Sequence, residues 1–276
     1  MADDAPGNTE IDDPAHAIGA PLRRVEDFRF LTGEGRYVSD IDIPGALHAV
    51  FLRSVHAHAT IRAIDSVEAL KIPGVVAVFT GEDMRADKIG PMRAMWSITA
   101  PDGSPMAEPE RFALARDKVC HVGEPVAIAI AETLSAAQDA AERIDVDYDI
   151  LSAQPSAPAA FTAGAEAIHD IAPDNACFRW VRGDAGKVAA AFKTAAQVVE
   201  IDLVNQRIGG AAIEPRALIA LPPRGHDKLT LYSSTQVPHH IRRLVTEQLG
   251  ISEARMRVVA PVSYTHLRAH ETTIEI

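Results

Sequence analysis

The sequence has few cysteines, few aromatic residues and no long apolar run, and each shortage excludes a class of protein. Its 276 residues contain two cysteines, Cys120 and Cys177, so no CxxC pair exists to hold zinc or an iron–sulfur cluster. Two thiols are also too few for a secreted disulfide scaffold, and we expect both to be buried in a protein of the reducing cytoplasm. The longest apolar run, residues 126–131, is far shorter than the roughly 18 residues of a membrane helix, so the sequence predicts a soluble protein.

Basic residues and the common catalytic motifs are also scarce. The 27 Lys and Arg residues face 38 Asp and Glu residues, a net charge of −11, which argues against binding to nucleic acid or to an anionic membrane. GxSxG, HExxH, GxxxxGK[ST] and a GxGxxG after a strand are all missing. We therefore expect proteins and small molecules as partners.

The first half of the chain predicts strands and helices in mixed order. Short β-branched runs at residues 47–52 and 74–80 predict strands, and Ser66 is placed to cap a short helix over 67–72 between them. Residues 126–131 predict a buried strand, and Ser135 and Gln138 have capping-box spacing for a helix that ends near residue 143. Apolar residues then alternate with aspartates over 144–150, which predicts a half-exposed strand.

A Pro- and Ala-rich stretch without periodicity, residues 153–165, predicts a linker between two domains. Beyond it we expect strands at 198–204, 217–221 and 229–233. A helix is predicted from Pro238 to the glycine at position 250, followed by a strand at 256–259. The sequence thus predicts an α+β protein with domains at 18–152 and 166–261 after a disordered tail, residues 1–17.

One segment has the chemistry of a binding site. Residues 234–238 (STQVP) join a predicted strand to a predicted helix, and ligands collect at such junctions in open α/β sheets. The amide of Gln236 has two N–H donors and a carbonyl acceptor, so it can orient an oxygen ligand without adding charge. A capping loop with an exposed amide is the alternative.

Other candidate residues have simpler explanations. Glu214 and Arg216 flank a proline, and they fit either a structural ion pair or a role in shaping the junction between domains. His56 and His58 share a strand face without a third ligand type nearby, and we expect structural or surface roles. His239 and His240 are adjacent on a helix and do not point at a shared metal. No metal ligand is therefore predicted.

Five blocks of sequence, taken together, resemble the molybdopterin-binding large subunit of the xanthine dehydrogenase, aldehyde oxidase and carbon monoxide dehydrogenase family. They occur in the family's order over residues 18–261. The blocks are residues 18–41 (IGAPLRRVEDFRFLTGEGRYVSDI), 47–61 (LHAVFLRSVHAHATI), 121–151 (HVGEPVAIAIAETLSAAQDAAERIDVDYDIL), 213–220 (IEPRALIA) and 231–251 (LYSSTQVPHHIRRLVTEQLGI).

The resemblance implies a fold, a cofactor and partners. It implies a hammerhead-like α/β domain over 18–152 and the start of a molybdenum-cofactor-binding α+β domain over 166–261. A molybdenum centre held by a pterin dithiolene, often the cytosine dinucleotide form, would hydroxylate a small-molecule substrate with water-derived oxygen. Gln236 corresponds to the residue whose amide approaches an oxo ligand of molybdenum. Electrons would pass to a 2Fe–2S small subunit and an FAD-binding medium subunit.

The sequence departs from the family pattern after residues 255–261 (RMRVVAP). A glycine-rich loop is expected there, but the chain reads VSYTHLRAHETTIEI over 262–276, which resembles translated sequencing adapter and is expected to be non-native. The family's general-base glutamate would lie far beyond. We expect an inactive N-terminal fragment of an enzyme that oxidises an aldehyde, an N-heterocycle or carbon monoxide. The alternative is a non-catalytic assembly or scaffold module in which Gln236 is only a cap.

Overall fold

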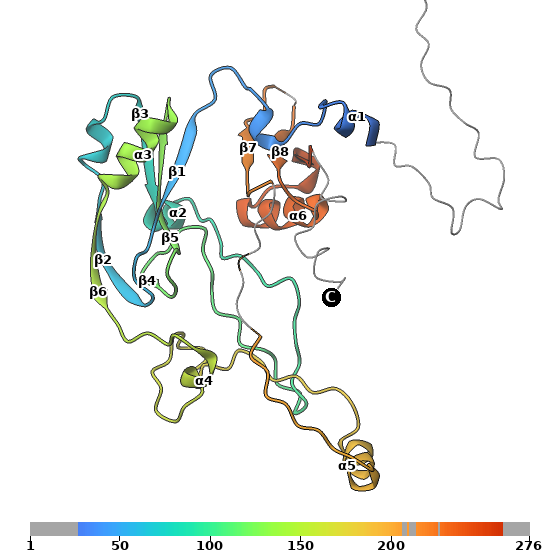
Figure 1. Cartoon of the computed structure of the whole chain (residues 1–276). Coiled ribbons are helices and arrows are strands. Elements are labelled where there is room, and N and C mark those ends of the chain that lie inside the picture. Colours follow the sequence, from blue (N-terminus) through green and yellow to red (C-terminus); the bar gives the residue numbers. More distant parts are fainter. Residues whose placement is uncertain (1–26, 206–208, 210–213, 226, 262–276) are drawn as a thin grey trace, which may run out of the picture.

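The computed structural model describes residues 27–205, 209, 214–225 and 227–261 (Figure 1). The predicted tail at 1–17 and the predicted non-native segment at 262–276 lie outside these residues. The elements of the first half are α1 (Asp27–Leu31), η2 (Val38–Asp40), β1 (His48–Arg53), β2 (Ala59–Asp65), η3 (Ala69–Lys71), β3 (Val75–Thr80), α2 (Gly81–Ala86), β4 (Lys118–Val119), β5 (Pro125–Ala131), α3 (Leu134–Glu142) and β6 (Asp145–Ile150). Those of the second half are α4 (Ala157–Ala160), α5 (Ala185–Thr194), β7 (Leu218–Leu221), β8 (Leu229–Ser233), α6 (Pro238–Leu249), η4 (Glu253–Arg255) and β9 (Met256–Val259).

The first half forms two antiparallel sheets of three strands, with the orders β1-β5-β3 and β4-β2-β6. Neighbouring strands are far apart in the sequence, since β2 pairs with β6 and β1 pairs with β5. The predicted strands at 47–52, 74–80, 126–131 and 144–150 all form, with bounds within one residue. The apolar strand β5 lies at the centre of its sheet, as its composition predicts.

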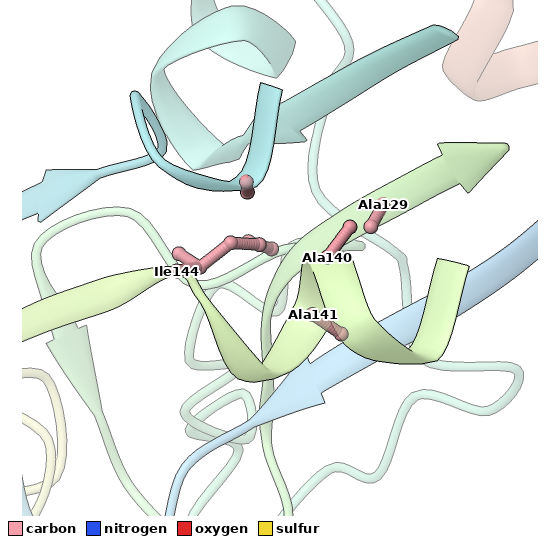
Figure 2. Close-up of a cluster of buried hydrophobic side chains, with 6 residues drawn as sticks. Ala129, Ala140, Ala141 and Ile144 are labelled. Carbon is pink, nitrogen blue, oxygen red and sulfur yellow. The ribbon is translucent and has the colours of Figure 1, made fainter. Parts of the chain in front are cut away.

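Helix α3 packs on the first sheet through a stripe of alanines (Figure 2). Ala140 and Ala141 on the helix, Ala129 on β5 and Ile144 at the start of the next segment belong to one buried cluster. Because the side chains on both surfaces are small, the helix backbone sits close to the strand. This layer of helix on sheet is one of two buried clusters of the first domain, and the other lies around Ala59, Val119 and Val126.

Two details of the predicted helices are wrong. Thr133, not Ser135, caps α3, since its side chain accepts a hydrogen bond from the Ala136 backbone N–H at 3.1 Å. The backbone of Thr133 is extended (φ −130°, ψ 152°), as an N-cap requires, whereas Ser135 is already inside the helix. The predicted helix at 67–72 is reduced to η3, whose N-cap residue makes no side-chain capping bond.

The second half contains a mixed sheet in the order β7-β8-β9. Strands β7 and β8 form an antiparallel hairpin, and α6 connects β8 to the parallel strand β9. Gly250 ends α6 in the left-handed conformation (φ 63°), the role predicted for it. The α+β fold class and the second strand–helix–strand unit are therefore confirmed.

The predicted strand at 198–204 is wrong for the structure as described, because these residues form no ladder with a described strand. Every residue from Phe178 to Asn205 is exposed, including the unpredicted helix α5. Figure 1 shows α5 set apart from both sheet-bearing regions. By contrast, the predicted linker contains the short helix α4, and the Asn175 side chain donates to the carbonyls of Ala160 (3.0 Å) and Glu166 (3.1 Å).

Candidate functional site

Gln236 lies in the loop between the end of β8 and the start of α6, where the sequence predicts it. Its side chain is exposed. The preceding residue, Thr235, accepts a hydrogen bond from the Val237 backbone N–H at 3.1 Å, which shapes the turn. Pro238 occupies the first turn of α6, and its N-cap residue, Val237, makes no side-chain capping bond. The amides of the first turn therefore keep the partial positive charge of a helix start.

Ser234 fixes this loop to the start of β7. Its Oγ accepts from the Ala217 N–H at 2.8 Å, and its own N–H donates to the Ala217 carbonyl at 3.1 Å. The same hydroxyl lies 3.2 Å from the Pro215 carbonyl, to which it can donate. The segment that carries Gln236 is thus held by the strand beside it, which gives its backbone a defined position.

Glu214 connects this region to the N-terminal part of the chain. It is 5% exposed, and its Oε1 accepts a hydrogen bond at 3.0 Å from the backbone N–H of Val38, which is itself 2% exposed. The two residues are 176 positions apart. Of the two explanations left open by the sequence, this bond favours a role at the junction between domains. Arg216 is exposed.

An open cavity of about 1160 Å³ lies beside the mixed sheet. Its lining comes from β7, β8, β9, the start of α6 and the segment at Ile43 and Pro44. The charged side chains around it are mainly basic; they are Arg224, Lys228, Arg242 and Arg257, against Asp227. Arg242 also donates to Glu253 at 3.0 Å. No local pattern in the sequence predicts this cavity, because its basic residues come from a turn, a helix and a strand that are separate in the chain.

Pro238 and His239 line the cavity, so Gln236 is two positions from its rim, although it is not itself a lining residue. His240 is exposed, like His239. Over the described ranges, no three His, Cys, Asp or Glu side chains are grouped as a metal site would require. Within the same residues, no helix combines the length and apolar character needed to cross a bilayer.

The histidines and cysteines of the first domain lie elsewhere. His58 is 3% exposed, its Nδ1 is 2.7 Å from the Ser152 carbonyl, and its Nε2 is buried without a hydrogen-bond partner among the described residues. His56 packs edge-on against Tyr148 with ring centroids 5.0 Å apart. Both cysteines are partly exposed rather than buried as predicted, and Cys120 Sγ lies 3.9 Å from His169 Nδ1. Partial burial raises the pKa of the Cys120 thiol and lowers the pKa of His169.

Comparison with known proteins places this geometry in a class. Residues 32–152 match the family model for the aldehyde oxidase and xanthine dehydrogenase a/b hammerhead domain. Residues 168–263 match the molybdopterin cofactor-binding domain, which includes the loop of Gln236 and the mixed sheet. These two domains in this order define the large subunit of a molybdopterin-dependent oxidoreductase.

The individual relatives agree with this class. The nicotine 6-hydroxylase large subunit of Paenarthrobacter nicotinovorans is 36% identical over 246 residues, which cover 89% of this chain and 29% of that protein. The carbon monoxide dehydrogenase large chain of Afipia carboxidovorans is 31% identical, with coverage of 93% and 32%. The crystal structure of quinoline 2-oxidoreductase from Pseudomonas putida 86 superposes with a TM-score of 0.74 at 32% identity, covering 86% of this chain and 29% of that one.

The chain therefore belongs to the family of molybdopterin-binding large subunits of the xanthine dehydrogenase, aldehyde oxidase and carbon monoxide dehydrogenase type. It spans about three tenths of the length of these bacterial relatives.

Proposed function

We propose that this chain forms the first part of a molybdenum hydroxylase large subunit that oxidises a small molecule with water-derived oxygen. The substrate classes that we propose are an aldehyde, an N-heterocycle or carbon monoxide. Relatives named for nicotine, quinoline, aldehydes and carbon monoxide support this range. We also propose that residues 1–276 alone have no turnover, because the family's general-base glutamate is expected far beyond the matched span.

The observation that carries the proposal is the position of Gln236. Its amide is exposed at the end of a strand and the start of a helix, in a loop that Ser234 holds in place. A neutral amide can donate to an oxo group and leave the charge of the site unchanged. The first turn of α6 adds further attraction for a group with negative character. We assign Gln236 as the residue that contacts the cofactor.

The cofactor that we propose is a molybdenum–molybdopterin, in the cytosine dinucleotide form. When bound, it supplies the redox chemistry, and the protein supplies placement and hydrogen bonding. The basic side chains around the cavity beside α6 suit a phosphate-bearing group, since Arg and Lys are common phosphate partners. The donors of the described residues are thus amides and cations, which fit the cofactor's oxygen atoms.

We further propose two partner subunits in the cytoplasm, an FAD-binding medium subunit and a small subunit with 2Fe–2S clusters. Relatives named as a large subunit or a large chain support separate partner subunits, and Cys120 and Cys177 are too far apart along the chain to form a cluster motif within these 276 residues. Co-purification of a tagged large subunit with its partners, followed by flavin and iron analysis, tests this part.

A chimeric large subunit tests the assignment of Gln236. Residues 1–261 replace the matched span of the Paenarthrobacter nicotine 6-hydroxylase large subunit, and molybdenum content and dye-linked turnover are measured. We expect Gln236→Ala to lower kcat about 100-fold with molybdenum retained, because one preorganised donor is lost. Gln138→Ala on the exposed surface of α3 is the matched control and leaves kcat unchanged.

Two results would contradict the proposal. Turnover and a molybdenum EPR spectrum that do not change in Gln236→Ala would remove this residue from the site. A chimera that assembles with partner subunits but never acquires molybdenum would favour the assembly module instead. Turnover by residues 1–276 alone would contradict the proposal that these residues have no activity by themselves.

A further inference from the structure

The segment at residues 198–204, hereafter the unpaired segment, has the sequence of a strand but pairs with no strand among the described residues. Val199, Ile201 and Leu203 alternate with Glu200 and Asp202, the period-2 pattern of a strand with one apolar face. That face is open, since these three side chains are 72%, 70% and 86% exposed. The pattern and the exposure do not agree with each other.

The backbone of the unpaired segment shows the same conflict. None of its N–H and C=O groups forms a backbone hydrogen bond with another described residue. The preceding helix α5 has ten residues and buries none of them, although isolated helices of this length are marginal in water. Figure 1 shows α5 away from the sheets. An exposed apolar strand edge invites pairing with another strand.

The partner is best sought in the rest of the same subunit. The unpaired segment lies inside the span that matches the molybdopterin cofactor-binding domain, residues 168–263. The bacterial relatives are about three times as long as the matched span, so they contain chain with which this region can pair. A second copy fits less well. Antiparallel pairing centred on Ile201 places Glu200 opposite Asp202, and like charges directly opposite destabilise a ladder.

We infer that the unpaired segment is a docking strand. It forms a β-ladder only with an extended strand from the remaining part of the molybdopterin-binding subunit, and it then buries Val199, Ile201 and Leu203. The identity of the partner rests on the proposed function, whereas the need for a neighbouring strand rests on the exposure and the backbone described above. The mode of recognition is strand addition, in which main-chain bonds give affinity and alternate side chains give specificity.

Hydrogen exchange tests the inference in two samples. In residues 1–276 alone, we expect the amides of the unpaired segment to exchange at the rate of an unstructured chain. In the cofactor-free chimera described above, we expect them to exchange at least tenfold more slowly. Ile201→Asp should reduce that protection on the order of 10- to 100-fold, because one apolar anchor is replaced by a charge. Glu200→Ala, on the other face, is the matched control and retains it.

Several outcomes would overturn the inference. The first is protection of the unpaired segment in the chain alone at low concentration, which would show an internal partner. The second is protection that rises with concentration together with a doubled mass, which would show a second copy. The third is equally fast exchange in the chain and the chimera. In the chain alone, Ile201→Asp should leave the melting temperature unchanged, and a decrease would also count against the inference. Because the exchange is measured without cofactor, a lack of turnover contradicts only the proposed function.

Discussion

The bond between Glu214 and Val38 predicts a specific cost when the carboxylate is removed. Both residues are buried, and the Val38 N–H donates to Glu214 Oε1 at 3.0 Å. In Glu214→Ala this N–H loses a charged acceptor, and a buried donor without an acceptor costs about 1–3 kcal/mol. At about 2 kcal/mol the local opening equilibrium rises roughly 30-fold, since about 1.4 kcal/mol corresponds to a factor of ten.

Amide exchange at Val38 measures this cost directly. A local probe is preferable to a global melt because a chain with two domains need not unfold in one step. We expect exchange at Val38 to accelerate about 30-fold in Glu214→Ala, and far less in Glu214→Gln, which keeps an acceptor oxygen of the same reach. Glu253→Ala, which breaks the exposed pair with Arg242, should leave Val38 unaffected. Unchanged exchange at Val38 in Glu214→Ala would refute the junction role.

Three further predictions concern the first domain. Thr133→Ala should destabilise α3 by about 1 kcal/mol, whereas Ser135→Ala should have little effect. The urea unfolding midpoints of the two variants measure this difference, and a larger decrease for Ser135→Ala would contradict the observed cap. Ala140→Leu should cost about 1–3 kcal/mol because it adds volume between α3 and β5, and an unchanged urea midpoint would show a looser contact. Burial raises the pKa of the Cys120 thiol. In a variant with Cys177 replaced by serine, the rate of alkylation by iodoacetamide should therefore rise at a higher pH than it does for glutathione. A profile at or below that of glutathione would show that the thiol is not desolvated.

The sequence predicted the elements of this protein well where local pattern and tertiary environment agree. The apolar run of β5 marks a central strand, and the alternating aspartates of β6 mark a half-exposed one. The end of α6 at Gly250 follows from the conformational freedom of glycine. In each case the residue types alone decide the local conformation.

The errors arose where the outcome depends on distant chain. The segment 198–204 has the pattern of a strand, but a strand requires a neighbour, and no local rule supplies one. The pairing of β2 with β6 and the bond from Glu214 to Val38 join residues far apart in the sequence, which no periodicity reveals. Gln236 could be predicted as a site residue because a loop between strand and helix is a local feature and because its STQ block resembles that of the family, and its role stays a prediction.

The strand order of the first domain also sets when it can fold during synthesis. Neither sheet is complete until its last strand along the sequence has been synthesised. β1 pairs with β5 and β2 pairs with β6, and β6 ends at Ile150. At about 5–20 residues per second, the ribosome takes roughly 4–17 seconds to produce the 85 residues between the end of β2 and the end of β6. β2 lacks β6 for all of this interval, and β1 lacks β5 for most of it. The nascent domain therefore keeps unpaired strand edges exposed until its closing strand has been made.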